Sequence, residues 1–232
     1  MFRMLKILPL LLALGTLGIF ATSCGTDHSK VRVVHASPDA QPVDVAVDGK
    51  TVVTNLAFGG VSPATGYLTV TAGNRKVEVR ATGTTTDLIN SNVSFGSGKE
   101  YTVLASGFAA NIAAIVLTDD NSAPASGNFK LRIVHASPSA PAINLDVYVV
   151  APGTDITGVS PTISSLAYGQ ASGYQTAAAA STEVIITAAG NKTPIIDQTY
   201  DLTAGQIRTL VVLDNAPGGS VNPIPLELAD LN

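Results

Sequence analysis

The stretch Val31–Pro38 reads Val-Arg-Val-Val-His-Ala-Ser-Pro, and a near copy, Leu131–Pro138, reads Leu-Arg-Ile-Val-His-Ala-Ser-Pro. The offset is 100 residues (131 − 31), and every polar residue recurs. Because side chains alternate along a strand, Val33 and His35 should share one face and Arg32 should lie on the other. We therefore expect one domain to occur twice, each copy opening with this strand.

Short Val-, Ile- and Thr-rich runs set off by Gly and Pro continue along the chain. The run at 43–47 alternates apolar and polar or small residues, and the Asp48-Gly49 pair after it is a strong hairpin signal. The pair Gly66-Tyr67 returns as Gly173-Tyr174. No stretch longer than a turn has a helical period. The pattern predicts an all-β chain of two tandem immunoglobulin-like β-sandwich domains.

The expected domains are a signal peptide at 1–23, a tether at 24–30, a first sandwich at 31–125 and a second at 126–232. A linker-like stretch, Asn-Ser-Ala-Pro-Ala-Ser-Gly at 121–127, places the boundary near 125–130. The strand at 130–135 could close the first domain or open the second.

The first hairpin of the second copy is longer than its counterpart. Its loop, about 151–161, is rich in Gly, Thr, Ser and Pro and carries Asp155 as its one charge. Such a loop can offer hydroxyl and backbone groups to a partner, so we expect it to be a recognition element. A neutral extension is the alternative, because hairpin tips tolerate insertion.

The N-terminus carries Arg3 and Lys6, then an apolar run, then small residues that end at Cys24. This order is typical of a secretory signal. Cys24 is the only cysteine, and its position resembles the acylated cysteine of bacterial lipoproteins, although Ala21 stands where Leu is usual. Gly25 follows it, so the acidic signal for inner-membrane retention is absent. We expect an exported protein, lipid-anchored at Cys24 in the cell envelope and by preference in the outer membrane. Release of a soluble protein is the alternative.

Charge and composition narrow the partners. After residue 23 the chain carries 13 − 2 − 17 = −6 charges, with no basic cluster. Nucleic acid is therefore a poor partner. Hydrophobic residues make up 46%, enough for a core in each copy, and no cysteine pair can form a disulfide. The expected partners are the membrane, through the lipid, and an envelope protein or a glycan.

The motif at 31–38, followed by Val43-Asp44-Val45 and the Asp48-Gly49 turn, resembles the DUF4397 family of domains in exported bacterial proteins. The second copy resembles it in 131–141 and in Asp146-Val147-Tyr148-Val149, and departs at the hairpin turn. The resemblance implies a β-sandwich and an exported location, and it brings no activity.

The residues His35 and Ser37, with Asp39 and Asp44 nearby in sequence, suggest a hydrolase or carbohydrate-active enzyme as the alternative function. A Ser-His-Asp site needs the serine hydroxyl beside an imidazole that a carboxylate holds. The second copy has Ser139 in place of Asp39, and no Gly-x-Ser-x-Gly turn occurs. The structural interpretation, in which each histidine caps a strand end and each serine bonds local backbone, is favoured. We therefore expect no catalytic residues.

The remaining candidates are metal ligands and recurring charges. Asp119-Asp120-Asn121 is a weak calcium candidate without EF-hand spacing, and is more typical of a solvated turn. No cofactor or metal is expected. The candidate ligand contacts are the residues that recur in both copies: Arg32, His35, Asp44, Arg132, His135 and Asp146. For the arginines, a structural pair with Asp44 or Asp146 is the favoured interpretation. The expected function is a non-enzymatic binding or structural module.

Overall fold

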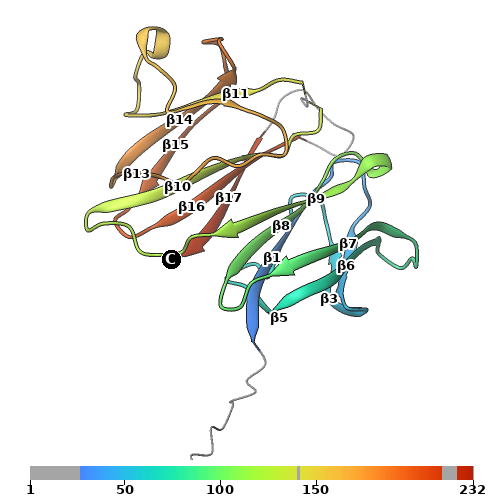
Figure 1. Ribbon diagram of the computed structural model, residues 1–232. Helices are drawn as coiled ribbons and strands as arrows, with labels where there is room; N and C mark the ends of the chain where they lie inside the picture. Colours follow the sequence, from blue (N-terminus) through green and yellow to red (C-terminus); the bar gives the residue numbers. More distant parts are fainter. Residues whose placement is uncertain (1–26, 140–141, 216–223, 232) are drawn as a thin grey trace, which may run out of the picture.

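The computed structural model describes residues 27–139, 142–215 and 224–231, and it is almost entirely β (Figure 1). The all-β sandwich prediction is confirmed. No helix in these ranges is long and apolar enough to cross a membrane.

The first half of the chain holds nine strands and one short 3-10 turn. They are β1 (His28–Ala36), β2 (Val43–Val47), β3 (Lys50–Leu56), β4 (Val61–Ser62), β5 (Leu68–Thr71), β6 (Gly73–Ala81), β7 (Asp87–Phe95), β8 (Glu100–Ser106), η1 (Ala109–Asn111) and β9 (Ala113–Asp119). One sheet has the order β4-β1-β8-β9, with β5 also on β1, and the other has the order β3-β2-β6-β7. The Asp48-Gly49 turn between β2 and β3 has φ of 51° and 78°, as a type I′ hairpin requires.

The second half repeats this order with eight strands. They are β10 (Asn128–His135), β11 (Leu145–Val150), β12 (Ile163–Leu166), β13 (Gln175–Ala178), β14 (Ala180–Ala188), β15 (Pro194–Leu202), β16 (Ile207–Leu213) and β17 (Ile224–Leu231), with η2 (Ile156–Gly158) after β11. The sheets are β13-β10-β16-β17 and β12-β11-β14-β15. The strand β10 thus opens the second half. Each of its sheets follows the strand order of one sheet of the first half, but among the described residues no named strand takes the place of β4.

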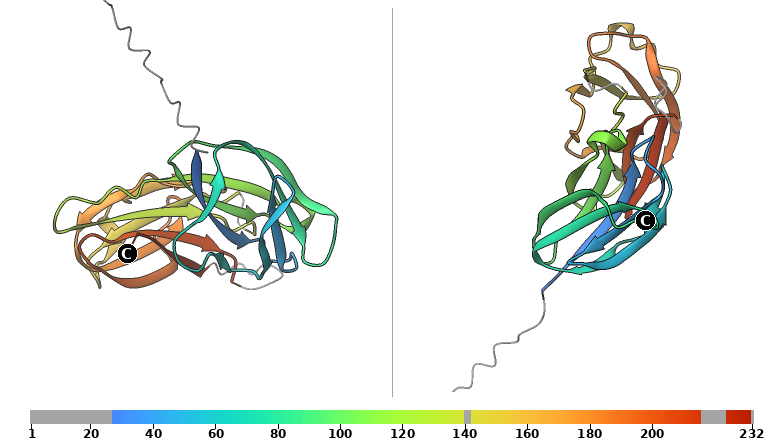
Figure 2. Two further views of the ribbon diagram at one scale, coloured as in Figure 1. Left: turned by 90° about the horizontal axis from the view of Figure 1, so that it is seen from below. Right: turned by 90° about the vertical axis from the view of Figure 1, so that its right-hand side faces the viewer.

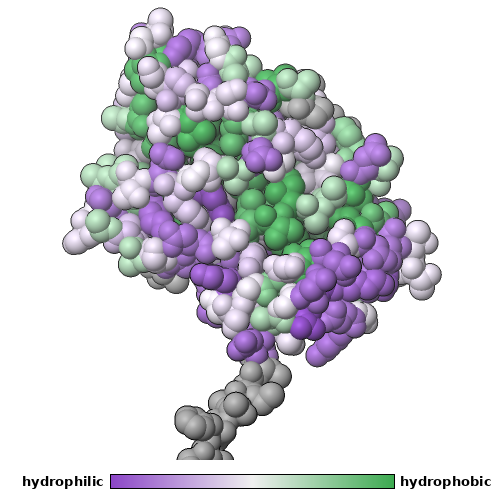
Figure 3. Space-filling model, viewed as in Figure 1, coloured by the Kyte–Doolittle hydropathy of each residue, from purple (hydrophilic) through white to green (hydrophobic). Residues whose placement is uncertain are grey.

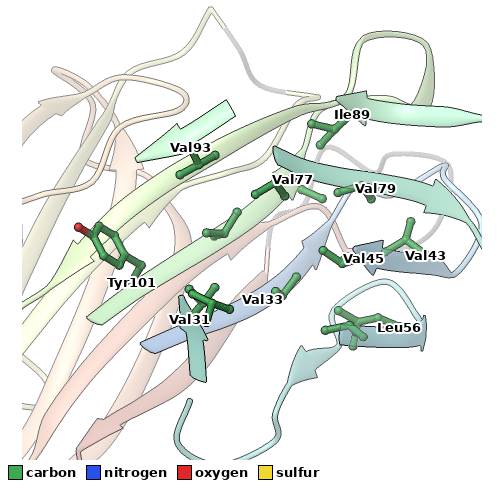
Figure 4. Packing of buried hydrophobic residues seen from close by; sticks show 14 of the residues in the cluster. Val31, Val33, Val43, Val45, Leu56, Val77, Val79, Ile89, Val93 and Tyr101 are labelled. Atoms are coloured by element: carbon green, nitrogen blue, oxygen red, sulfur yellow. The ribbon is translucent and has the colours of Figure 1, made fainter. Parts of the chain in front are cut away.

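Each half has its own apolar core between its two sheets. In the first half the core brings Val31 and Val33 of β1 against Val45 of β2, and Val77 and Val79 of β6 (Figure 4). The second half builds the same core from Leu131 and Ile133 with their neighbours. The predicted alternation therefore holds. In each motif strand, the aliphatic residues two positions apart point into the core of their own half.

A third apolar cluster joins the two halves. We call the sheets that contain β1 and β10 the facing sheets, because their outward faces pack on each other. This cluster is made of Val34, Ala36, Leu104, Val134, Ala136, Val211, Leu213 and Leu228. Figures 1 and 2 show the two halves side by side along this contact. The outward face of the motif strand, which its alternation alone would leave to solvent, is therefore buried against the other half.

Candidate functional site

Arg32 projects from the outward face of β1 into the contact between the halves, where only 2% of its surface is exposed. Its guanidinium pairs with the carboxylate of Asp230 on β17 and donates to the Ala229 carbonyl at 3.0 Å. It also donates to Thr102 Oγ1 on its own sheet at 2.7 Å. Every one of these partners is held by a strand, so the arginine is fixed rather than free for a ligand.

Arg132 makes the same set of contacts in the opposite direction. It projects from β10, donates to Asp119 Oδ1 of β9 at 2.6 Å, and donates to the Thr118 carbonyl at 3.2 Å. Its Nε donates to Thr209 Oγ1 at 3.0 Å. Each half thus sends one arginine to the closing strand of the other, as the two subunits of a two-fold dimer would.

Two tyrosines complete the cluster, one from each Gly-Tyr pair. The Tyr67 hydroxyl donates to Asp119 at 2.9 Å, and the Tyr174 hydroxyl donates to Asp230 at 3.0 Å. The Arg32 guanidinium lies 5.2 Å from the centre of the Tyr67 ring, and that of Arg132 lies 4.7 Å from the Tyr174 ring. Cation–π contact of this kind strengthens when the charge is desolvated.

The pKa shifts in the cluster keep its tyrosine and arginine side chains protonated. Burial, followed by the Asp119 charge, raises the pKa of Tyr67, so its phenol stays protonated and continues to donate. Burial acts to lower the pKa of Arg132, but Asp119, Tyr174 and Asp230 outweigh it and raise that pKa. The ten groups are therefore mutually satisfied: two arginines, two aspartates, two threonines, two tyrosines and two strand carbonyls.

Each arginine forms a structural pair with a carboxylate, as the sequence favoured, but the partners are Asp230 and Asp119 and not Asp44 or Asp146. Asp44 instead accepts from the Asn55 amide at 2.8 Å, the bond that does most to lower its pKa, and from Thr82 Oγ1. Asp146 likewise accepts from the Ser165 amide at 2.8 Å. Asn55 and Ser165 have φ of 51° and 54°, a region that costs energy for residues other than Gly. The two aspartates thus recur because each stabilises a left-handed residue in the return strand.

His35 sits at the end of β1 with both ring nitrogens bonded to backbone. Its Nε2 donates to the Gln41 carbonyl at 3.1 Å, and its Nδ1 accepts from the Ser37 amide at 3.3 Å. Burial is the larger effect on this ring and lowers its pKa. The imidazole is therefore neutral, with no lone pair left to activate a hydroxyl. His135 occupies the same place, with Nε2 at 3.1 Å from the Ile143 carbonyl and its ring edge-on to Tyr168.

The serines of the motif bond carboxylates, not the local backbone that the sequence suggested. Ser37 makes a long 3.5 Å hydrogen bond to Asp39. Ser137 donates to the buried Asp214, which also accepts from Ser139 at 2.7 Å. Both motif serines are fully buried, so neither hydroxyl is placed to attack a substrate.

The Asp119-Asp120-Asn121 segment is neither a calcium loop nor a fully solvated turn. Asp119 is buried and belongs to the arginine cluster. Asp120 pairs with Lys130 at 2.8 Å, and that contact is the main reason why its pKa falls to about 2. Within the described ranges no group of three or more His, Cys, Asp or Glu side chains is arranged to hold a metal ion.

The long loop of the second half folds onto its own outer sheet. Ile156 in η2 packs on Tyr148 and Ile185, and Lys192 donates to the Tyr148 hydroxyl at 3.0 Å. These contacts give the loop a packing role, while its role in recognition stays a prediction. The lipid site predicted at Cys24 lies outside the described residues.

Sequence reasoning missed Asp119 and Asp230 as the partners of the arginines. A signal was present, because Leu117-Thr118-Asp119 returns as Leu228-Ala229-Asp230. The recurring Gly-Tyr pair and the match of Thr102 to Thr209 pointed to the same cluster. What the sequence could not show was that the pairs cross between halves.

Comparison with solved structures finds proteins of low similarity. A carbohydrate-binding module of Eubacterium rectale Amy13K, solved with maltoheptaose, is 11% identical, with 87% of this chain and 97% of that one covered and a TM-score of 0.28. Family 41 carbohydrate-binding modules of streptococcal virulence factors are 13% identical, covering 82% and 95%, with a TM-score of 0.27. The Bacillus anthracis TIE protein is 9% identical, with 81% of this chain and about a third of that one (33%) covered and a TM-score of 0.28.

The search of curated proteins finds no match. The family model described as a domain of unknown function, DUF4397, matches residues 29–148. This match spans more than half of the chain and runs from β1 through the arginine of β10 into β11. The chain therefore belongs to the DUF4397 family.

Proposed function

We propose that this protein is a non-catalytic module of the bacterial cell envelope, in which two tandem copies of the family's domain form one packed unit. The observation that carries the proposal is the reciprocal pairing of Arg32 with Asp230 and of Arg132 with Asp119. The recurring polar residues of the motif are all used in structural contacts. We therefore assign binding to the surface of the protein and not to a buried site.

The second half supports the tandem-copy part of the proposal. Its sheets follow the strand order of the first half, and its arginine, threonine, tyrosine and aspartate meet in the same geometry. The crossed contacts are those of an isologous dimer whose two chains have become one. The benefit of the covalent link is that the interface no longer depends on protein concentration.

The N-terminal signal supports anchoring through Cys24. Cells that express the full chain and grow with an alkyne-tagged fatty acid should yield a labelled protein, and Cys24→Ser should remove the label. Mass spectrometry of the N-terminal peptide should then identify an acylated Cys24. An unmodified peptide that begins elsewhere contradicts the anchor and leaves the module itself untouched.

The hydrolase alternative has its own test. A fluorophosphonate probe reacts with serines that a neighbouring base activates, so Ser37 and Ser137 should stay unlabelled in the native protein. Photo-crosslinking in intact envelopes should meanwhile retrieve the same partners from the parent chain and from Ser37→Ala/Ser137→Ala. Probe attached to either serine, with its loss in the alanine variant, overturns the non-catalytic proposal.

A further inference from the structure

The closing strand of the first half, β9, is an open edge. Among the described strands it pairs only with β8, and β7 on the other sheet pairs only with β6. Between these edges lies an open groove of about 460 Å³, lined by residues 88–93 of β7 together with Ile112, Ala113, Ala114 and Val116. Val116 is 40% exposed, high for a large aliphatic residue in this chain. Figure 3 shows hydrophobic surface gathered where β9 crosses this face.

The backbone of β9 offers hydrogen-bonding groups along this edge. The carbonyl of Thr118 points away from β8, because it accepts from Arg132 of the other half. In an antiparallel pair every second residue points its N–H and C=O the same way, so Val116 and Ala114 also direct theirs outward. Among the described residues, no loop backbone bonds the outward groups of Val116 and Ala114. Each of the two residues thus presents one donor and one acceptor to an incoming strand.

The matching edge of the second half is blocked against such pairing. The register of β16 with β17 places Pro225 where β9 has Ala114, and Glu227 where β9 has Val116. Proline removes the outward donor, and Glu227 places a carboxylate on the edge strand, where it forms a 2.9 Å ion pair with Arg208 of the neighbouring strand β16. Charges and prolines are the usual devices that prevent strand addition at sheet edges.

The chemistry of the groove defines what could fill the unblocked edge. Its lining is aliphatic on the β9 side and includes Asn90, Ser91 and Asn92 on the β7 side, without a charged residue. A charged segment would lose hydration there without gaining a partner. The lining also has no aromatic ring to stack on a sugar face. An uncharged peptide that alternates small apolar with Ser, Thr or Asn residues suits both the groove and the backbone groups.

We propose that β9 is a docking site for an extended, uncharged segment of a partner protein, which adds a strand next to Ala114 and Val116. This inference rests on the proposed binding function and specifies where that binding takes place. Backbone hydrogen bonds supply the affinity, and alternate side chains of the segment enter the groove between β7 and β9. The edge of the second half that carries Pro225 and Glu227 does not take part in this docking.

The test transfers the blocking residues from one edge to the other. Random peptides displayed on phage are selected on the full mature chain, and enriched peptides are synthesised with a fluorescent label. Ala114→Pro and Val116→Glu should each weaken binding about tenfold or more, because each removes a backbone bond or introduces an unpaired charge. Since Ala114 directs its N–H away from β8, the proline removes no bond of the β8–β9 ladder. Thr69→Glu, on the opposite edge of the same sheet, should bind as the parent does.

Amide hydrogen exchange supplies a second readout on the parent chain. The amides of Ala114 and Val116 should exchange quickly in the free protein and slowly in the peptide complex. Thermal melts of all variants establish that the folds are intact. The proposal is overturned if both edge variants bind the peptides as tightly as the parent chain does. It is also overturned if the selection enriches no peptide.

Other occupants have distinct results, each of which also overturns it. A dimer in sedimentation that Val116→Glu dissociates would make a second copy of this chain the occupant. Retention of oligosaccharides on a glycan array, lost in Val116→Glu, would make it a glycan. If the crosslinked partners of the envelope are unchanged in Val116→Glu, the edge proposal fails while the non-catalytic module stands. If fluorophosphonate labels Ser37 or Ser137, the non-catalytic proposal fails while the docking site at β9 stands.

Discussion

The two facing sheets carry the same polar residues in the same places, whereas the corners and edges of the two halves differ. Arg, Thr, Asp and Tyr recur in the contact between halves with nearly identical distances. At the corner after the motif, by contrast, the motif serine donates to Asp39 in the first half and to Asp214 in the second. At the closing strand, Val116 is replaced by Glu227.

This difference teaches how to interpret residues that recur in two halves of similar strand order. A residue that faces the other copy has a partner in that copy, so both positions are constrained together. A residue that faces solvent or a loop has no such reciprocal partner and can change in one copy alone. The polar residues of the motif recur because they build contacts, and they should not be interpreted as a repeated ligand site.

The largest effects should come from the arginines. Arg32→Met and Arg132→Met should each lower the free energy of unfolding by about 3–5 kcal/mol, because each leaves a buried aspartate without its cation. The two losses should be similar, since the contacts are reciprocal. Urea unfolding of each variant measures them, with the partly exposed Arg75→Met as the control that should lose far less.

A marked inequality between the two arginine variants would break the comparison. It would mean that one ion pair contributes most of the stability of the contact between the halves and the other contributes little. A double-mutant cycle of Arg32→Met with Asp230→Asn should give a loss well below the sum of the single losses, because the two side chains act on each other.

The serines of the motif should give a smaller and unequal pair of effects. Ser137→Ala should cost about 1.5–3 kcal/mol, because the hydroxyl donates to the fully buried charge of Asp214. Ser37→Ala should cost about 1 kcal/mol or less, because its bond to Asp39 is long. Thermal and urea unfolding of the two single variants compare them directly, and equal losses would show that the corners have not diverged in energy.

Tyr101 is a first-half feature that the second half lacks. Its hydroxyl accepts from the Gly96 amide at 2.8 Å, which is the tyrosine-corner arrangement, while Arg208 holds its place in the other copy. Tyr101→Phe should cost about 0.5–1.5 kcal/mol, the value of one hydrogen bond. Urea unfolding measures this loss, and no change would mean that water satisfies the freed amide.

The sequence predicted much of the fold because the fold depends on local patterns. Alternation in the motif strand, the Asp48-Gly49 turn and the recurring landmarks all predicted a strand or a turn from neighbouring residues. The interpretation of His35 as a residue that caps a strand end rested on the same local reasoning, and His35 does bond backbone within six residues of itself.

The contact between the halves could not be predicted in the same way. Arg32 and Asp230 are 198 residues apart, and nothing local at either residue names the other. The alternation of β1 showed that Arg32 shares a face with Val34 and Ala36, but a face of that composition fits both an edge near solvent and a sheet contact. Only the packing of the facing sheets distinguishes the two.

The smallest effect should be a dependence of stability on pH that originates at His35. Burial, which outweighs the bond to Gln41, lowers the pKa of this ring in the folded protein, so below about 6.5 the unfolded chain binds the proton that the folded chain refuses. The contribution of His35 to stability is therefore complete above that pH and is lost as the pH falls toward the folded-state pKa. Unfolding free energies measured between neutral and mildly acidic pH should decline less steeply in His35→Gln than in the parent, although the variant is less stable at neutral pH. An identical slope in both proteins would assign the acid sensitivity to other groups, and the same substitution at His135 would show whether the second half supplies it.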